Sequence, residues 1–119
     1  MLIGGVCLAA LASPGCDASG GGTLYQRLQH EDPAVRIEAM RQAVRQNDDQ
    51  ALPYLVDRLN DSETDVRFFA IVALEKMTGR RMGYEHYAPA TQRAEAVERW
   101  RAWLRRRGQP ATRPASRPA

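Results

Sequence analysis

The segment Asp32-Pro33-Ala34-Val35-Arg36 recurs 31 residues later as Glu63-Thr64-Asp65-Val66-Arg67. The same shift aligns apolar positions on both sides of these segments, pairing Leu24 with Leu55, Leu28 with Leu59, Ala39 with Ala70, and Met40 with Ile71. Each unit therefore holds two leucines, an acidic or prolyl turn, a Val-Arg pair, and an alanine three residues after the arginine. A period between about 20 and 50 residues is typical of stacked repeats, so we expect helical units that bury their faces against one another.

The units are expected to be helical because apolar residues from Thr23 onward recur at helical spacing, not at the alternating spacing of strands. Asp32 followed by Pro33 is typical of a helix start, and Gly79 of a helix end. Ser62 with Asp65 three residues later resembles a capping box. We expect helices over residues 23–29, 33–46, 50–60, 63–77 and 91–107.

Two of these helices carry most of the apolar surface. The helix over 63–77 is apolar nearly all round, through Phe68, Phe69, Ile71 and Val72, which predicts burial on more than one side. The helix over 91–107 is amphipathic and suits the end of an array, where one face must stay polar. Its apolar side, which includes a tryptophan pair expected to face the core, consists of Val97, Trp100, Trp103 and Leu104.

The repeated unit resembles the HEAT family, in particular its short repeats related to phycobilisome lyases. The two Val-Arg segments carry the resemblance, together with Ala51-Leu52-Pro53-Tyr54-Leu55, which we interpret as the opening of a second helix. It covers residues 24–77 and implies an all-α fold: a short right-handed α-solenoid of about two and a half repeats with a C-terminal capping helix. In such repeats the arginine pairs with an acidic residue or a carbonyl of an adjacent repeat, so Arg36 and Arg67 are expected to be structural.

The N-terminal end is typical of an export signal. Residues 2–12 carry no charge, and they are too few to span a membrane, which takes about 20 apolar residues. Ser13-Pro14-Gly15-Cys16 resembles the lipobox of bacterial lipoproteins, which implies a lipid on Cys16 and a place at the cell envelope. Two other outcomes stay open: cleavage after Ala12, which would release a soluble protein, or an uncleaved N-terminus in a cytosolic protein. We thus divide the chain into a signal peptide (1–15), a Gly/Ser-rich tether (16–22), the repeat domain (23–107) and a disordered Pro/Arg-rich tail (108–119).

No motif of the sequence points to catalysis, and we expect neither an enzyme nor a cofactor. The two histidines, His30 and His86, lie in different loops, and both cysteines precede the repeat domain, so a zinc site lacks ligands. Gly20-Gly21-Gly22 has neither the preceding strand nor the following Lys-Ser/Thr of a phosphate-binding loop.

We therefore expect a non-catalytic scaffold that binds a protein partner. The candidate partner-binding residues are Tyr54, Asp57 and Arg58 in a groove of second helices, and Tyr84, His86 and Tyr87 in the irregular segment 79–89. The two tyrosines of that segment are also expected to pack it against the last helices. The alternative function is the binding of nucleic acid or anionic surfaces through the arginine-rich C-terminus of a chain with net charge +3, with nucleic acid the less favoured ligand. Docking onto another repeat protein is a third possibility.

Overall fold

The computed structural model describes residues 21–109, in which there are five α-helices and one 3-10 helix. The elements are α1 (Leu24–Arg27), α2 (Pro33–Gln46), η1 (Asp49–Ala51), α3 (Leu52–Arg58), α4 (Thr64–Thr78) and α5 (Ala90–Arg106). The predicted signal peptide, Cys16 and the tail beyond residue 109 lie outside the described residues.

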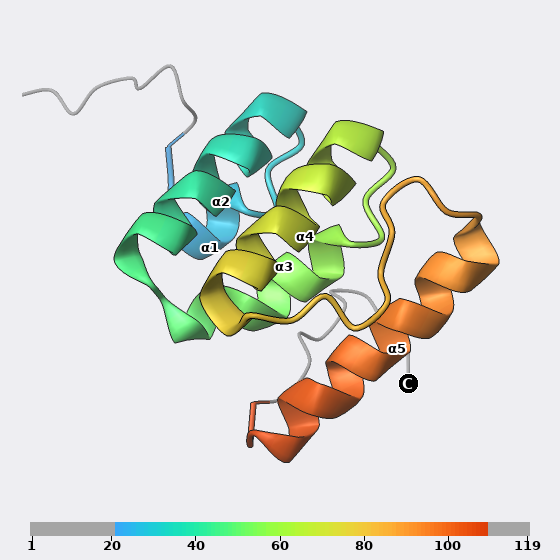
Figure 1. Ribbon diagram of the computed structural model, residues 1–119. Coiled ribbons are helices and arrows are strands. Elements are labelled where there is room, and N and C mark those ends of the chain that lie inside the picture. Colours follow the sequence, from blue (N-terminus) through green and yellow to red (C-terminus); the bar gives the residue numbers. More distant parts are fainter. Residues whose placement is uncertain (1–20, 110–119) are drawn as a thin grey trace, which may run out of the picture.

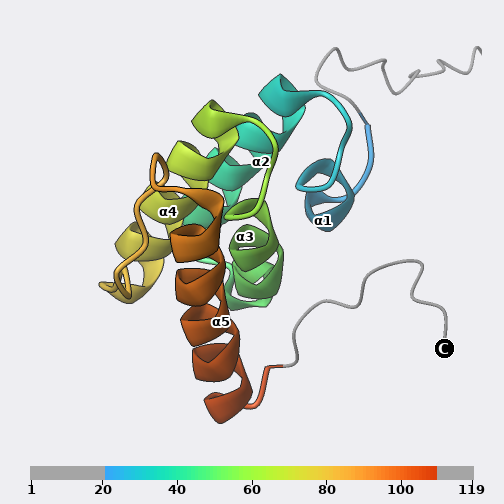
Figure 2. The same cartoon turned by 90° about the vertical axis from the view of Figure 1, so that its right-hand side faces the viewer.

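The helices are arranged as two stacked pairs followed by a single helix. α1 packs on α2 and α3 packs on α4, and the pairs meet through α2 and α4, which lie side by side (Figure 1). α5 packs against α3 (Figure 2). α2 and α4 therefore form one layer, and α1, α3 and α5 form the other. The prediction of an all-α fold built from short helical repeats is confirmed.

The two ends at which the sequence pattern is clearest, the start of α2 and the end of α4, follow local chemistry. The Asp32 side chain accepts a hydrogen bond from the amide of Ala34 at 2.9 Å, and Pro33 occupies the first turn of α2. Gly79 ends α4 with a left-handed φ of 75°. The expected capping box at Ser62 is wrong, because Glu63 is the N-cap of α4 and Asp61 accepts the hydrogen bond from the Glu63 amide at 3.0 Å.

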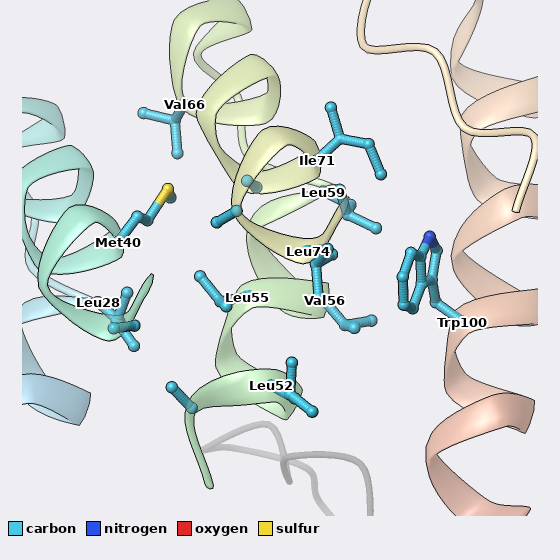
Figure 3. Close-up of a cluster of buried hydrophobic side chains, with 14 of the residues drawn as sticks. Leu28, Met40, Leu52, Leu55, Val56, Leu59, Val66, Ile71, Leu74 and Trp100 are labelled. Atoms are coloured by element: carbon cyan, nitrogen blue, oxygen red, sulfur yellow. The ribbon is translucent and has the colours of Figure 1, made fainter. Parts of the chain in front are cut away.

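The core lies between the two layers and continues under α5. Its largest fully buried side chains include Leu28, Met40, Leu55, Leu59, Leu74 and Trp100 (Figure 3). Trp100 is fully buried and Trp103 is half-buried against the same core, as the amphipathic pattern predicts. α4 is not buried all round, however: Phe68 is 42% exposed, because the α2–α4 layer has no further helix over it among residues 21–109.

Arg36 and Arg67 make equivalent hydrogen bonds within their own units. In each, Nη1 donates to the carbonyl groups six and five residues earlier, at 2.6 and 3.0 Å for Arg36 and at 2.8 and 3.3 Å for Arg67. Each arginine also reaches the next segment. Arg36 Nη2 donates to Asp61 Oδ1 at 2.9 Å while its Nε lies 2.9 Å from Oδ2, and Arg67 Nε donates to the His86 carbonyl at 3.1 Å. The two side chains thus hold the turns of successive units together.

Three hydrogen bonds attach the segment between α4 and α5 to Leu59, Trp100 and Arg67. The Tyr84 hydroxyl donates to the Leu59 carbonyl at 2.6 Å, and Trp100 Nε1 donates to the Arg81 carbonyl at 3.2 Å. The contact of Arg67 with His86 is the third. Burial raises the pKa of the Tyr84 phenol above its ordinary value of 10.0, against the opposing effect of nearby arginines. The segment is therefore a fixed part of the fold.

Candidate partner-binding face

The outer surface of α2 and α4 contains a groove of about 330 Å³, which we call the α2/α4 groove. Its lining residues are Met40, Arg41, Val44, Arg45, Phe69, Val72, Ala73 and Lys76. The floor is apolar because α2 and α4 both carry apolar side chains outside the stripe that packs into the core. The rim carries three basic side chains, which lie on both helices. A groove of this kind suits a partner segment that brings apolar side chains and carboxylates together.

The basic side chains of the rim keep most of their charge available. Arg41 and Arg45 lie 3.7 and 3.5 Å from the Glu38 carboxylate, but all three side chains are about half exposed, so water screens these ion pairs. The Arg41 guanidinium also lies over the Phe69 ring, 5.4 Å from its centroid. Among residues 21–109, no ion pair involves Lys76. The rim therefore presents net positive charge.

A row of aromatic rings, which we call the aromatic strip, extends the groove toward the segment before α5. Phe69 contacts Phe68, Phe68 contacts His86, and His86 contacts Tyr87, with ring centroids 5.3, 5.0 and 5.1 Å apart. Phe68 and Tyr87 are 42% and 71% exposed. Since Phe69 belongs to both features, the strip and the groove form one continuous surface. Contiguous exposed apolar side chains of this sort mark interaction sites.

The strip brings together two of the predicted partner-binding residues, His86 and Tyr87, and excludes a third. Tyr84 is a correction: it is fully buried, and its hydroxyl bonds the Leu59 carbonyl, so it has no surface to offer a partner. Tyr87 departs from the expectation that it packs the segment against the last helices, since most of its side chain is in solvent. The contacts of Tyr87 are instead with the neighbouring ring of the strip.

Tyr54, Asp57 and Arg58 do not lie in a groove of second helices. The internal repeat aligns Leu55 with Leu24, which makes α3 the first helix of its pair, and α3 lies in the layer opposite the α2/α4 groove. The three residues are also occupied within the fold. Tyr54 stacks on Tyr25 with centroids 5.2 Å apart, Asp57 lies 3.8 Å from Arg101 of α5, and Arg58 donates to Asp61 at 3.2 Å. The expected groove is therefore wrong for these three residues, and their part in partner binding stays a prediction.

The residues of the α2/α4 groove were not among the predicted sites. The signal for them was present, because Phe68, Phe69 and Val72 give α4 more apolar surface than one packed face requires. The apolar pattern alone predicts burial of this surface. In a short array it marks the face that no further element of residues 21–109 covers.

Two other site classes find no support in residues 21–109. No three side chains of His, Cys, Asp or Glu in this range are grouped to hold a metal ion. Within the same range, no helix has both the length and the apolar character needed to cross a bilayer.

Stacked helix pairs, joined by repeated arginines and presenting a groove on one layer, define a helical-repeat protein. The family model for HEAT repeats matches residues 23–90, more than half of the chain. The chain belongs to the HEAT-repeat family, whose members generally mediate protein–protein interaction as non-catalytic scaffolds. No curated protein and no solved structure matches it.

Proposed function

We propose that this chain is a non-catalytic protein-interaction module that is exported, held at the cell envelope by a lipid on Cys16, and bound to a protein partner through the α2/α4 groove and the aromatic strip. The observation that carries the binding proposal is the continuity of the two features. Together they place an apolar floor, three basic side chains and two exposed aromatic rings on one side of the molecule. Interfaces concentrate their binding energy in such central apolar and aromatic anchors.

The partner that fits this face is a protein segment with an apolar stripe flanked by carboxylates. The apolar stripe would pack on Phe69 and Val72, and the carboxylates would reach the rim at Arg41, Arg45 and Lys76. Charge complementarity of this kind raises the association rate and selects the orientation of the bound segment.

The binding face is tested by exchanging one aromatic and one basic residue on it. Phe68→Ser with Lys76→Glu changes exposed side chains, so the fold should be retained. The control, Gln29→Ser with Arg105→Glu, likewise changes two exposed side chains, one of them by charge reversal, outside this face. Proteins crosslinked to each variant in the host's envelope fraction would be quantified by mass spectrometry. We expect the partner's recovery to fall at least about tenfold with the first variant and to change little with the control, because losing a central anchor residue costs about 2 kcal/mol or more.

The binding proposal fails if the control loses the same proteins, or if the face variant retains every protein that the wild type captures. Circular dichroism of both variants separates loss of the face from loss of the fold.

The lipid anchor is supported by the sequence around Cys16 and by the Gly/Ser-rich residues that follow it, which suit a tether between a lipid and a folded domain. We expect the intact mass of the protein recovered from host membranes to show loss of residues 1–15 and addition of a diacyl or triacyl group. A Cys16→Ser variant should carry no such addition. An unmodified soluble chain with its first residues intact would overturn the export proposal.

A further inference from the structure

A second depression, of about 610 Å³, lies where the segment after α4 meets the C-terminal half of α5. We call it the arginine pocket; its lining residues are Arg80, Met82, Gly83, Arg99, Ala102, Trp103 and Arg106. Arg99, Trp103 and Arg106 follow one another at helical spacing, so they project from one face of α5. Arg80 approaches from the other wall. Three guanidinium groups from two segments thus surround one shallow space.

Arg99 is held in place in this pocket. Its Nε donates to the Met82 carbonyl at 2.9 Å, which directs the rest of the guanidinium over Gly83. A Cβ added at Gly83 would lie 2.9 Å from Arg99 Nη2, and the backbone there has a φ of +76°, so only glycine fits without strain. Met82 also has a positive φ, of 54°. The Arg99 guanidinium therefore lies against the backbone of this turn.

The pocket lacks the negative charge that accompanies other arginines nearby. Arg81, Arg101 and Arg107 lie 2.9, 3.0 and 3.2 Å from carboxylates of Glu75, Glu98 and Asp49 respectively. By contrast, none of the ion pairs in residues 21–109 involves an arginine of the pocket, and no acidic residue lines it. Like charges placed together without counter-charges repel one another. An external anion would relieve that repulsion.

The shape and chemistry of the pocket favour a phosphate at a membrane surface. Guanidinium groups match phosphate oxygens in geometry as well as in charge. Trp103 forms an apolar wall, and Arg107 lies over its ring, 4.7 Å from the centroid. Tryptophan beside arginine is typical of side chains at a membrane–water interface. Nucleic acid needs an extended basic groove that follows many phosphates, whereas these guanidinium groups converge on a single space.

We propose that the arginine pocket binds the phosphate of an anionic phospholipid and so lays the C-terminal half of α5 on the membrane surface. The existence of an anion site stands on Arg80, Arg99, Arg106 and Trp103 alone. The choice of a lipid as the source of the phosphate rests on the proposed anchoring at Cys16. The site is separate from the α2/α4 groove, with which it shares no lining residue.

The test uses the full chain carrying Cys16→Ser, so that no acyl group contributes to membrane binding. Its partitioning onto vesicles of equal parts phosphatidylglycerol and phosphatidylcholine would be measured by sedimentation, beside vesicles of phosphatidylcholine alone. In this background, R80Q/R99Q/R106Q is expected to lower the partition coefficient on the anionic vesicles roughly a hundredfold, since each arginine near the surface contributes a factor of about five. R80Q/R106Q, which keeps the hydrogen bond from Arg99 to Met82, is expected to lower it by more than about tenfold.

The matched control is R41Q/R45Q/K76Q, which removes an equal number of positive charges from the α2/α4 groove. It should change partitioning by no more than about twofold. Equal losses in the two triple variants would reduce the effect to net charge and overturn the proposal. So would unchanged partitioning of the pocket variants, or loss of single-stranded nucleic acid binding by those variants with vesicle binding intact. Because no groove partner and no acyl group take part in this measurement, its failure is distinguishable from failure of the proposed function.

Discussion

Replacing Asp61 by alanine is expected to lower the free energy of unfolding by about 3 to 5 kcal/mol, a large fraction of the stability of a domain of this size. The Asp61 carboxylate is buried between Arg36 and Arg58, and it also accepts the hydrogen bond from the Glu63 amide at 3.0 Å. Its removal leaves the charge of Arg36, which is only 7% exposed, without a counter-charge. Urea denaturation followed by circular dichroism would measure the loss.

The control for Asp61 is Glu38→Ala. Glu38 also lies near two arginines, but its side chain is about half exposed, so its removal should cost less than about 1 kcal/mol. Replacing both members of the buried pair, as Arg36→Met with Asp61→Leu, should cost less than Asp61→Ala alone, because the charge of Arg36, the more deeply buried of the two arginines beside Asp61, is removed together with its partner. Equal losses for Asp61→Ala and Glu38→Ala would refute this account of the joint between the two units.

The second large effect is expected at Trp100. Trp100→Ala should lower the free energy of unfolding by about 3 to 5 kcal/mol, because it removes the largest fully buried side chain and leaves a cavity between α5 and α3. Figure 3 shows the indole of Trp100 directed from α5 toward the side chains of α3. The substitution also leaves the Arg81 carbonyl without the donor that lies 3.2 Å away. Chemical denaturation would again give the magnitude.

Trp103 is the natural control for Trp100, since it lies one turn away on the same helix and is only half-buried. We expect Trp103→Ala to cost less than half as much. Trp100→Phe keeps most of the apolar volume and should lie between the two alanine variants. If the Trp103 variant proved as unstable as the Trp100 variant, α5 would not be docked mainly through Trp100.

The fold could be predicted from the sequence where local chemistry and the internal repeat agree. The expected helix over 33–46 matches α2 at both ends, because a capped start at Asp32-Pro33 and a left-handed Asn47 at the end leave little freedom. The start of α4 was less clear, since Ser62 offers the hydroxyl of a capping box but Asp61 accepts the nearby hydrogen bond instead. Asp61 is held in place by Arg36 from the preceding unit and by Arg58, and the contact with Arg36 cannot be derived from the local sequence.

The candidate site could be predicted only in part, because it depends on which helices face each other. Phe68 and Val72 have the composition of core residues, and nothing local tells that the layer of α2 and α4 is left uncovered in residues 21–109. Tyr84 and Tyr87 stand three residues apart in an irregular segment, yet one is fully buried and the other mostly exposed. The difference arises because the Tyr84 hydroxyl donates to the Leu59 carbonyl, a main-chain group from another part of the chain.

The hydrogen bonds of Arg36 and Arg67 to main-chain carbonyl groups bear on how such a protein changes over generations. A carbonyl is present at every position whatever the side chain, so mutation can alter the turn while the bond persists. The two turns already differ, with His30-Glu31 in one and Asp61-Ser62 in the other, and both arginines make the same contacts. A duplicated 31-residue unit would bring these bonds to its own turn with it. Its joint to the next unit would still need an acceptor for the rest of the guanidinium, which is the Asp61 carboxylate for Arg36 and the His86 carbonyl for Arg67. A gene can therefore copy the turn unchanged, whereas the contact between units depends on the unit that follows.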